Sequence, residues 1–588
     1  MKSIKIKRGL ATASLGVLAL LSATGQAQAG KAKADTVVHS GKIYTGVDKE
    51  PWVEAVAIRD GVVVAAGKSG KMLKRAATDA TLIDLGGRMA MAGIIDAHSH
   101  PVDGAVMKLF ECTFPFSATP DEIAAAVTAC VAGAGDEPWI AGGQWDSNFF
   151  VNNKIASPRK FLDKVSGGKA VGLVDDSGHN AWLNTKALKL VGITAQTPDP
   201  AGGRIGREAD GKTPNGVLEE TAATIASPFL TAHTPEQFAA AVEEMQVMLN
   251  GLGITAVKIA NMPDEHLEAV ALADADGDLR LHVTTSLATH YGARSEKLDV
   301  AGLISKRDQY KTANVNTNAV KIFLDGVPTA ARTAGMLAPY APDSHFPDGY
   351  LGEMHLTEEL LAADMTALDA AGFAVKIHTA GDGSVRRALN AIEVARKANG
   401  MGGKQHELAH AGYVDPADIA RFKALNVAPD FSPFIWSPSP IIDSVVQAVG
   451  PRGEHYWPTK DLIESGAVIV AGSDWPSAVS SPSPWPGIET LVTRRAADGD
   501  YDGALWPEEA VSLEDAIEIY TENSATALDV ENVTGRIEKG AIADIIVLSQ
   551  NIFDVDPAKI SDTEVVLTLF KGKVVSAKGP FEALTAGK

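Results

Sequence analysis

The chain has 588 residues, of which 45% are apolar and 21% charged, so it is long enough to bury more than one hydrophobic core. This composition excludes a disordered chain, a collagen and a coiled coil. The 73 acidic and 53 basic residues give a net charge of −20, which argues against a broad nucleic-acid surface because phosphate binding needs clustered cations. A small-molecule partner is expected, and a nucleic acid is not.

Residues 1–29 are predicted to be a secretory signal peptide and not part of the fold. Four cations precede an apolar run over residues 10–21, and Ala27-Gln28-Ala29 offers a small-residue cleavage site. A membrane anchor is disfavoured because the run is shorter than the ~20 apolar residues that span a bilayer. We expect a periplasmic or secreted protein with no membrane association after cleavage. In that oxidising context, Cys112 and Cys130 either form a disulfide or are buried as apolar residues.

Both ends of the chain carry the alternating pattern of short β-strands. Residues 55–64 form a hairpin pattern around the turn Asp60-Gly61, and a similar texture returns only at residues 543–575. Each half alone would have difficulty burying a face. The sequence therefore favours one composite β-sandwich domain, built from residues 30–90 and 535–588.

Strands and helices alternate over residues 91–534. Thr357 is placed to cap a helix that ends near Gly372, and Asp415-Pro416 begins a later helix. Apolar strands are predicted at 93–95, 254–257, 279–283, 319–323, 373–377 and 467–471. This number of units predicts the α/β class, as a closed (β/α)8 TIM-type barrel in preference to a small open sheet.

Residues 101–230 fit the barrel pattern poorly. They contain stretches rich in Gly and Pro, and two clusters of aromatic and polar residues at 144–146 and 175–182. We interpret them as an inserted lid region that covers the barrel mouth, excludes water and selects the substrate.

The strongest chemical signal is an apolar strand that runs into His98 and His100. Side chains at i and i+2 share a face of a strand, so both imidazoles can point into the barrel mouth and bind one metal ion. Taken alone, the pair is as compatible with two surface histidines. His378, His410 and Asp474 also end apolar strands. The carboxyl ends of barrel strands converge on the face where catalytic residues lie, so these five side chains are predicted to meet.

Lys321 lies within a strand that is otherwise typical of a core. Burying it unpaired costs several kcal/mol, so we expect it to be modified or paired. Carbamylation by CO₂ would make it an anion able to bridge two divalent ions; the alternatives are snorkelling past the strand end or pairing with Asp325. Lys258 and Lys376 also lie in apolar strands, and Glu220 is another candidate for a bridging anion.

The segment His406–His410 matches the HExxH pattern, which on a helix holds zinc with two histidines and supplies a glutamate base. Gly402-Gly403 and Gly412 bracket only eight residues, and a strand is due after the preceding helix. We therefore predict a strand, from whose end only His410 reaches the site.

Further candidates come from the two polar clusters and from tryptophans. His179 is a candidate for substrate contact or catalysis, with a hydrogen-bonded structural histidine as the alternative. Trp145, Trp436 and Trp475 are candidates to line an apolar pocket, with plain packing as the alternative.

Together these residues resemble the amidohydrolase superfamily, in the metal-dependent branch that includes N-substituted formamide deformylases. The resemblance covers nearly all of the chain after residue 29. It rests on the His98/His100 pair, Lys321 in KIFLDG, His378 in HTAGDG, His410 in LAHAG, Asp474 in GSDWP, and the closing GRIEKGAIADIIVL. It implies one divalent ion at His98, His100 and Asp474, a second at His378 and His410, and carbamylated Lys321 between them.

The resemblance also implies hydrolysis of an amide-like C–N bond by metal-activated water. Asp474 would accept the proton of the water and deliver it to the leaving amine, while His378 or His179 would polarise the carbonyl. Alternatives are a lactone, ester or carbamate hydrolase with the same site, and a non-catalytic periplasmic binding protein. Zinc is favoured, but the residues leave open the metal, one ion or two, the substrate, and whether the chain forms a homo-oligomer.

Overall fold

The structure is a computed structural model that describes residues 33–585, except 147, 201, 231, 343–345, 436, 498, 500 and 532. The predicted signal peptide and Trp436 lie outside the described residues. Within the described part of the chain, no helix is long and apolar enough to cross a membrane.

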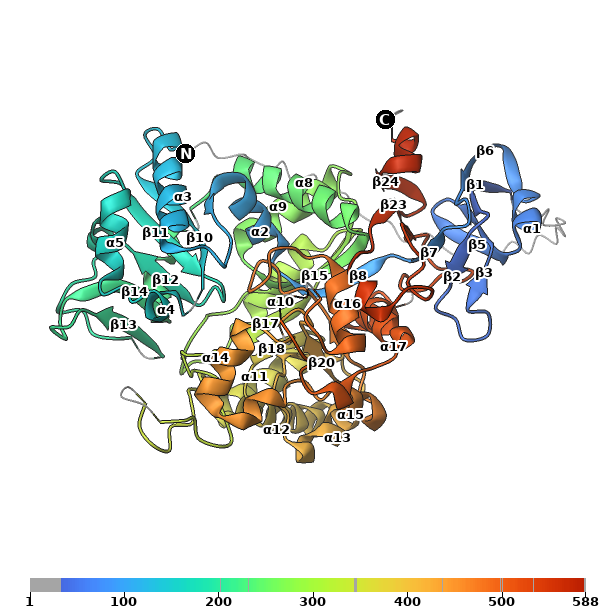
Figure 1. Cartoon of the computed structure of the whole chain (residues 1–588). Coiled ribbons are helices and arrows are strands. Elements are labelled where there is room, and N and C mark those ends of the chain that lie inside the picture. The colour runs from blue at the N-terminus through green and yellow to red at the C-terminus, as the bar shows by residue number, and fades with distance from the viewer. Residues whose placement is uncertain are drawn as a thin grey trace, which may run out of the picture.

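Eight parallel strands form the central sheet (Figure 1). Adjacent strands follow one another in the chain: β8 (Ile94–Ser99), β15 (Ile254–Met262), β16 (His282–Leu287), β17 (Val315–Phe323), β18 (Ala374–Thr379), β19 (His406–His410), β20 (Val427–Phe431) and β21 (Val470–Ala471). Just beyond β21, the amide of Asp474 donates to the carbonyl of His98 over 2.7 Å, which ties the last strand to the first. The sheet is therefore a nearly closed barrel, and the predicted fold class is confirmed.

Helices surround the barrel strands (Figure 1). They are α2 (Pro101–Phe110), α8 (Pro235–Gly251), α9 (Asp264–Ala275), α10 (Val300–Tyr310), α11 (Glu358–Ala370), α12 (Asp382–Asn399), α13 (Pro416–Leu425), α14 (Pro440–Val449), α15 (Thr459–Ser465), α16 (Pro484–Thr493), α17 (Leu513–Glu518) and α18 (Ser524–Leu528). Thr357 and Asp415 cap α11 and α13 as predicted, each accepting a backbone N–H. The carbonyl of Leu528 accepts from Thr284 and Asn316 near the amino ends of β16 and β17, so α18 covers the barrel end opposite the predicted site.

Two barrel strands begin three residues later than predicted. The strand expected at 279–283 begins only at His282, because side chains of α8 form hydrogen bonds with the backbone just before it. Gln246 Oε1 accepts from the amide of Arg280 over 2.6 Å, and Asn250 Nδ2 donates to its carbonyl over 3.2 Å. The strand expected at 467–471 is reduced to β21, which pairs only with the end of β20.

The region predicted as an insertion contains a folded unit, residues 112–230, with its own sheet. The sheet comprises β9 (Cys112–Thr113), β10 (Trp139–Trp145), β11 (Ala170–Asp175), β12 (Asn180–Leu183), β13 (Gly203–Arg207) and β14 (Pro214–Glu220). Its helices are α3 (Pro120–Gly133), α4 (Phe149–Asn152), α5 (Pro158–Val165), α6 (Thr185–Leu190) and α7 (Ser227–Leu230). Two hydrophobic clusters support this inserted unit, which is therefore more than a set of loops.

Two further sheets lie on the other side of the barrel (Figure 1). One has β1 (Ala34–His39), β4 (Ala55–Arg59), β5 (Val62–Gly67) and β6 (Ala76–Asp84), with the short helix α1 (Ser69–Leu73) beside it. The other has β2 (Lys42–Tyr44), β3 (Trp52–Val53), β7 (Met89–Ala92), β22 (Ile545–Leu548), β23 (Val565–Phe570) and β24 (Lys573–Ala577). Antiparallel pairing of Met91 with Ile546 joins the two ends of the chain. Their apolar residues share one core, as expected for a composite sandwich.

Cys112 and Cys130 form a disulfide that links β9 to α3. We expect Cys112→Ala/Cys130→Ala to lower the free energy of unfolding of the inserted unit by about 3 kcal/mol, because the disulfide spans 18 residues. Trp145 and Trp182 lie in the same core, so tryptophan fluorescence during urea titration measures this change. Reduced wild type should unfold at the same urea concentration as the double variant. Two reactive thiols in the unreduced, denatured wild type would contradict the disulfide.

Candidate metal centre and its cavity

Three predicted ligands meet at the carboxyl end of the barrel. His98 lies near the end of β8, His100 just beyond it, and Asp474 follows β21. Oδ1 of Asp474 lies 3.3 Å from His98 Nε2 and 3.4 Å from His100 Nε2. One ligand atom from each residue lies within 4.8 Å of the other two, so a single cation can contact all three.

The donor atoms of this triad fit a metal ion. His98 Nδ1 lies 2.7 Å from Asp430 Oδ2, which fixes the ring with its proton on that nitrogen. Its Nε2 is buried and has no hydrogen-bond partner among the described residues. Burial and the nearby charge of Lys376 lower the pKa of His98 well below its usual value, so the imidazole is neutral. A buried, neutral nitrogen beside a carboxylate and a second imidazole matches a cation site.

His410 and His378 extend this group of imidazoles. The ring centre of His410 lies 5.0 Å from that of His98 and 4.6 Å from that of His378. His410 Nδ1 is 3.9 Å from Asp474 Oδ2. Burial is the main reason why the pKa values of His378 and His410 are lowered. The structure thus brings together the five predicted histidine and aspartate residues.

Left-handed backbone turns two of these residues toward the site. His410 has a φ of +71° and Asp474 a φ of +56°, which is uncommon for residues other than glycine. Both lie at the ends of barrel strands. In an extended strand, side chains point alternately to the two faces, and the left-handed conformation interrupts this alternation. Backbone contacts hold them, since Trp457 Nε1 donates to the carbonyl of His410 and the Asp474 amide donates to His98.

Asp325 orients His378 and does not pair with Lys321. Its Oδ1 accepts from His378 Nδ1 over 2.9 Å, and its other partners are the amides of Gly335, Ala380 and Gly381 and the hydroxyl of Ser384. His378 therefore keeps Nε2 for a ligand. The alternative in which Asp325 neutralises Lys321 is wrong, because these donors already satisfy the carboxylate.

Lys321 differs from the other two lysines of the barrel interior. Lys376 Nζ lies 2.7 Å from Glu407 Oε2 and also contacts Asp430, while Lys258 contacts Glu407 and donates to a backbone carbonyl. The amine of Lys321 forms no ion pair or hydrogen bond among the described residues and lies 5.0 Å from the ring of Phe323. Burial lowers the pKa of Lys321 to about 8. Of the three lysines, it alone lacks a described partner.

A second constellation faces the site from the inserted unit. His179, in the β11–β12 turn, has its ring centre 5.6 Å from that of His378. His179 Nδ1 lies 2.9 Å from Glu220 Oε2 and 2.8 Å from Tyr291 Oη, while Thr333 donates to Glu220 over 2.5 Å. The pKa of Glu220 falls to about 2, because its pairing with His179 and these hydrogen bonds outweigh burial. Its carboxylate holds His179 and does not join the metal triad.

Both groups open into one cavity of about 1260 Å³, lined by the barrel mouth and the inserted unit. Its apolar wall is formed by Phe434, Ile435, Ile441, Val445, Tyr456 and Trp457. Trp145 packs in the core of the inserted unit, and a Cβ on Gly104 would lie 2.1 Å from the ring of Trp475. Neither tryptophan lines the cavity, so plain packing is the correct alternative for both.

The sequence model of the amidohydrolase family matches residues 81–576, which is most of the chain. The chain belongs to the amidohydrolase family. It is 27% identical to the putative amidohydrolase YtcJ of Bacillus subtilis, over 92% of this chain and 99% of the relative. It is 24% identical to N-substituted formamide deformylase of Arthrobacter pascens, over 92% of this chain and 97% of the relative. The predicted resemblance to the amidohydrolases is confirmed.

A solved structure supports the same fold. An uncharacterized metal-dependent hydrolase from Pyrococcus furiosus matches the amidohydrolase with a TM-score of 0.66 and 24% identity. The match covers 89% of this chain and all of the solved one, so the two proteins share a fold over most of this chain.

The HExxH segment of the amidohydrolase is β19, a parallel strand between β18 and β20, as predicted. His406 is buried, where its Nδ1 accepts from the amide of Val375 and its Nε2 lies 3.2 Å from Asp369 Oδ1. Glu407 points into the barrel toward Lys258 and Lys376. The zinc-helix alternative is therefore wrong.

Several functional partners escape the sequence analysis of the amidohydrolase. Asp430, Tyr291 and Thr333 each act on a predicted site residue. Asp430 leaves one usable signal, a carboxylate inside an apolar strand. Tyr291 and Thr333 lie outside the described strands and helices and follow no recognisable motif.

We expect Glu407→Gln to lower the free energy of unfolding by about 3–5 kcal/mol, because it leaves Lys258 buried without its carboxylate. Urea denaturation measures the loss. Glu393→Gln is the control, since its partly exposed pairs with Lys397 and Arg421 contribute about 0–1 kcal/mol. Lost activity with unchanged stability would instead make Glu407 a catalytic base.

Proposed function

We propose that this chain is an exported, metal-dependent amidohydrolase that cleaves an amide-like C–N bond of a small molecule. The observation that carries the proposal is the meeting of His98, His100 and Asp474 at a buried imidazole nitrogen that has no hydrogen-bond partner among the described residues. His410 and His378 lie beside this group, at the edge of a large cavity. The relative named N-substituted formamide deformylase supports a C–N bond as the target. The leader pattern and the disulfide support export to an oxidising compartment.

The proposed cofactor is zinc, as one or two ions, which suits imidazole and carboxylate ligands. His98, His100 and Asp474 would hold the first ion, and His378 and His410 the second, with Lys321 carbamylated between them. The unpartnered amine of Lys321 supports its selection over Lys258 and Lys376. A bound ion supplies Lewis acidity and lowers the pKa of water.

Asp474 is the proposed proton shuttle. Both triad imidazoles contact its Oδ1, while its Oδ2 faces His410. Its carboxylate accepts a proton from water as the C–O bond forms, and delivers that proton to the amine nitrogen as the C–N bond breaks. The products are a carboxylic acid and an amine.

His179 is the proposed donor to the substrate carbonyl. Glu220 and Tyr291 occupy its Nδ1, which leaves Nε2 for a ligand in the cavity. Although burial opposes protonation, pairing with Glu220 raises the pKa of His179, which favours a proton on Nε2. An N–H at this position stabilises the negative charge that develops on the carbonyl oxygen. His378, oriented by Asp325, faces the same space.

We expect Asp474→Asn to lower kcat by a factor of about 10² to 10⁴, because an amide cannot accept and return the proton. Circular dichroism should show an intact fold, and kcat is measured on the metal-loaded enzyme. Asp461→Asn on α15 is the matched control, since this aspartate is exposed and lies outside the cavity lining. Turnover of Asp474→Asn within twofold of wild type would reject the proposed shuttle.

A substrate panel separates amide hydrolysis from the hydrolysis of lactones, esters and carbamates. We expect formamides, N-acyl amines or other amides to be hydrolysed faster than matched lactones, esters and carbamates. Metal analysis of the same preparation should give one or two ions per chain. A preference for lactones would replace the C–N assignment, and a protein without bound metal or turnover would favour a binding function.

A further inference from the structure

The charged side chains that line the cavity are mainly carboxylates. Besides Asp474, they are Asp103, Glu111, Asp146, Asp176, Glu220 and Asp562. Among the described residues, Lys321 is the one lysine in this lining, and the lining holds no arginine. The internal positions that the structure does not describe are neither lysine nor arginine.

The lysine of the lining does not offset these carboxylates away from the reaction centre. Lys321 lies two residues before the end of β17 and lines the cavity there, and its proposed carbamylation would make it an anion. The ions proposed above would add their charge at the same place, next to the scissile carbonyl. A carboxylate on a distant part of a substrate would therefore meet no lysine or arginine from the described lining.

Two of these carboxylates, Asp103 on α2 and Glu111 just after it, form what we call the acidic wall of the cavity. Glu111, which directly follows α2, has Oε1 at 3.2 Å from His233 Nε2, and Asp103 Oδ1 lies 3.8 Å from His266 Nε2. The ring centre of Phe238 lies 5.9 Å from His233 and 4.9 Å from His266. Carboxylates beside an aromatic ring suit an amine or a neutral aromatic group and repel an anion.

We propose that the enzyme selects amides whose non-reacting part is neutral or cationic, and rejects those that carry a free carboxylate or phosphate. This inference rests on the proposed function. Entry into the cavity removes part of the hydration of a substrate anion while placing it among carboxylates. Away from the reaction centre, no lysine or arginine of the described lining repays that loss. N-acyl amino acids are therefore poor substrates, and N-acyl amines are good ones.

A matched series of N-formylbenzylamines tests the charge preference. The para substituent is methyl, aminomethyl or carboxylate, so the size is nearly constant while the charge is zero, positive or negative. We expect kcat/KM for the carboxylate compound to be at least tenfold below that for the methyl compound. The kcat/KM of the aminomethyl compound should equal or exceed that of the methyl compound. An anion that is cleaved as well as the neutral compound overturns the inference.

Calorimetric binding of the three compounds to metal-loaded Asp474→Asn separates this inference from the proposed function. Absent turnover by wild type refutes amide hydrolysis, whereas the binding order still reports the charge preference. The carboxylate compound should bind at least tenfold more weakly than the methyl compound. Equal or tighter binding of the anion overturns the inference.

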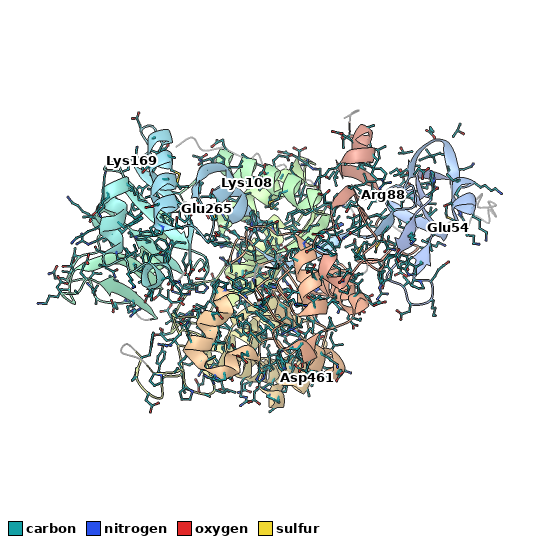
Figure 2. The ribbon with its side chains drawn as sticks, in the orientation of Figure 1. Glu54, Arg88, Lys108, Lys169, Glu265 and Asp461 are labelled. Carbon is teal, nitrogen blue, oxygen red and sulfur yellow. A yellow bond between two sulfur atoms is a disulfide. The ribbon has the colours of Figure 1, made fainter. Side chains whose placement is uncertain are left out.

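The acidic wall is tested by the double variant Asp103→Asn/Glu111→Gln, which keeps hydrogen-bonding groups opposite His266 and His233. We expect the ratio between methyl and carboxylate compounds to shrink at least threefold. The control Glu265→Gln/Asp461→Asn makes the same change in net charge at exposed positions outside the cavity lining (Figure 2). An equal shift in the control, or none in the cavity variant, overturns the role of the wall.

Discussion

The carboxylate of Asp430 connects the barrel interior to the proposed metal site, because it contacts both His98 Nδ1 and the ammonium of Lys376. Lys376 also contacts Glu407, which in turn contacts Lys258. Each of these charges would be costly to bury alone, so the order of cations and anions constrains where each side chain lies. The imidazole of His98 is the last member of this series. Its orientation is therefore set by the barrel interior and does not depend on surface loops.

The barrel and the inserted unit contribute different parts of the chemistry. The barrel supplies side chains that converge at its carboxyl end, supported by one large hydrophobic cluster. The inserted unit supplies His179 and Glu220 on a sheet with two clusters of its own. Because the inserted unit has separate cores, its residues that line the cavity can change without repacking the barrel around the proposed metal ligands.

The parts of the site that follow from strand geometry could be predicted from the sequence. His98, His100 and His378 end apolar strands, and parallel strands bring such ends together. Contacts between distant segments could not be predicted in this way, since Asp430 meets His98 across 332 residues of sequence. The inserted unit also escaped detailed prediction, because its short strands are separated by turns rich in Gly and Pro. His410 reaches the site through a left-handed backbone conformation, which residue patterns do not reveal.

The pairing of β22 with β7 has a consequence for the order of folding. Until the ribosome has made β22, the sheet that contains β7 has only the short strands β3 and β2 beside it. Long-range closure is entropically costly and slow, so an early strand must wait for a late one across the whole barrel. The pairing of β22 with β7 is therefore expected to form late in folding. A nascent or truncated polypeptide that lacks β22 exposes an unpaired edge at β7.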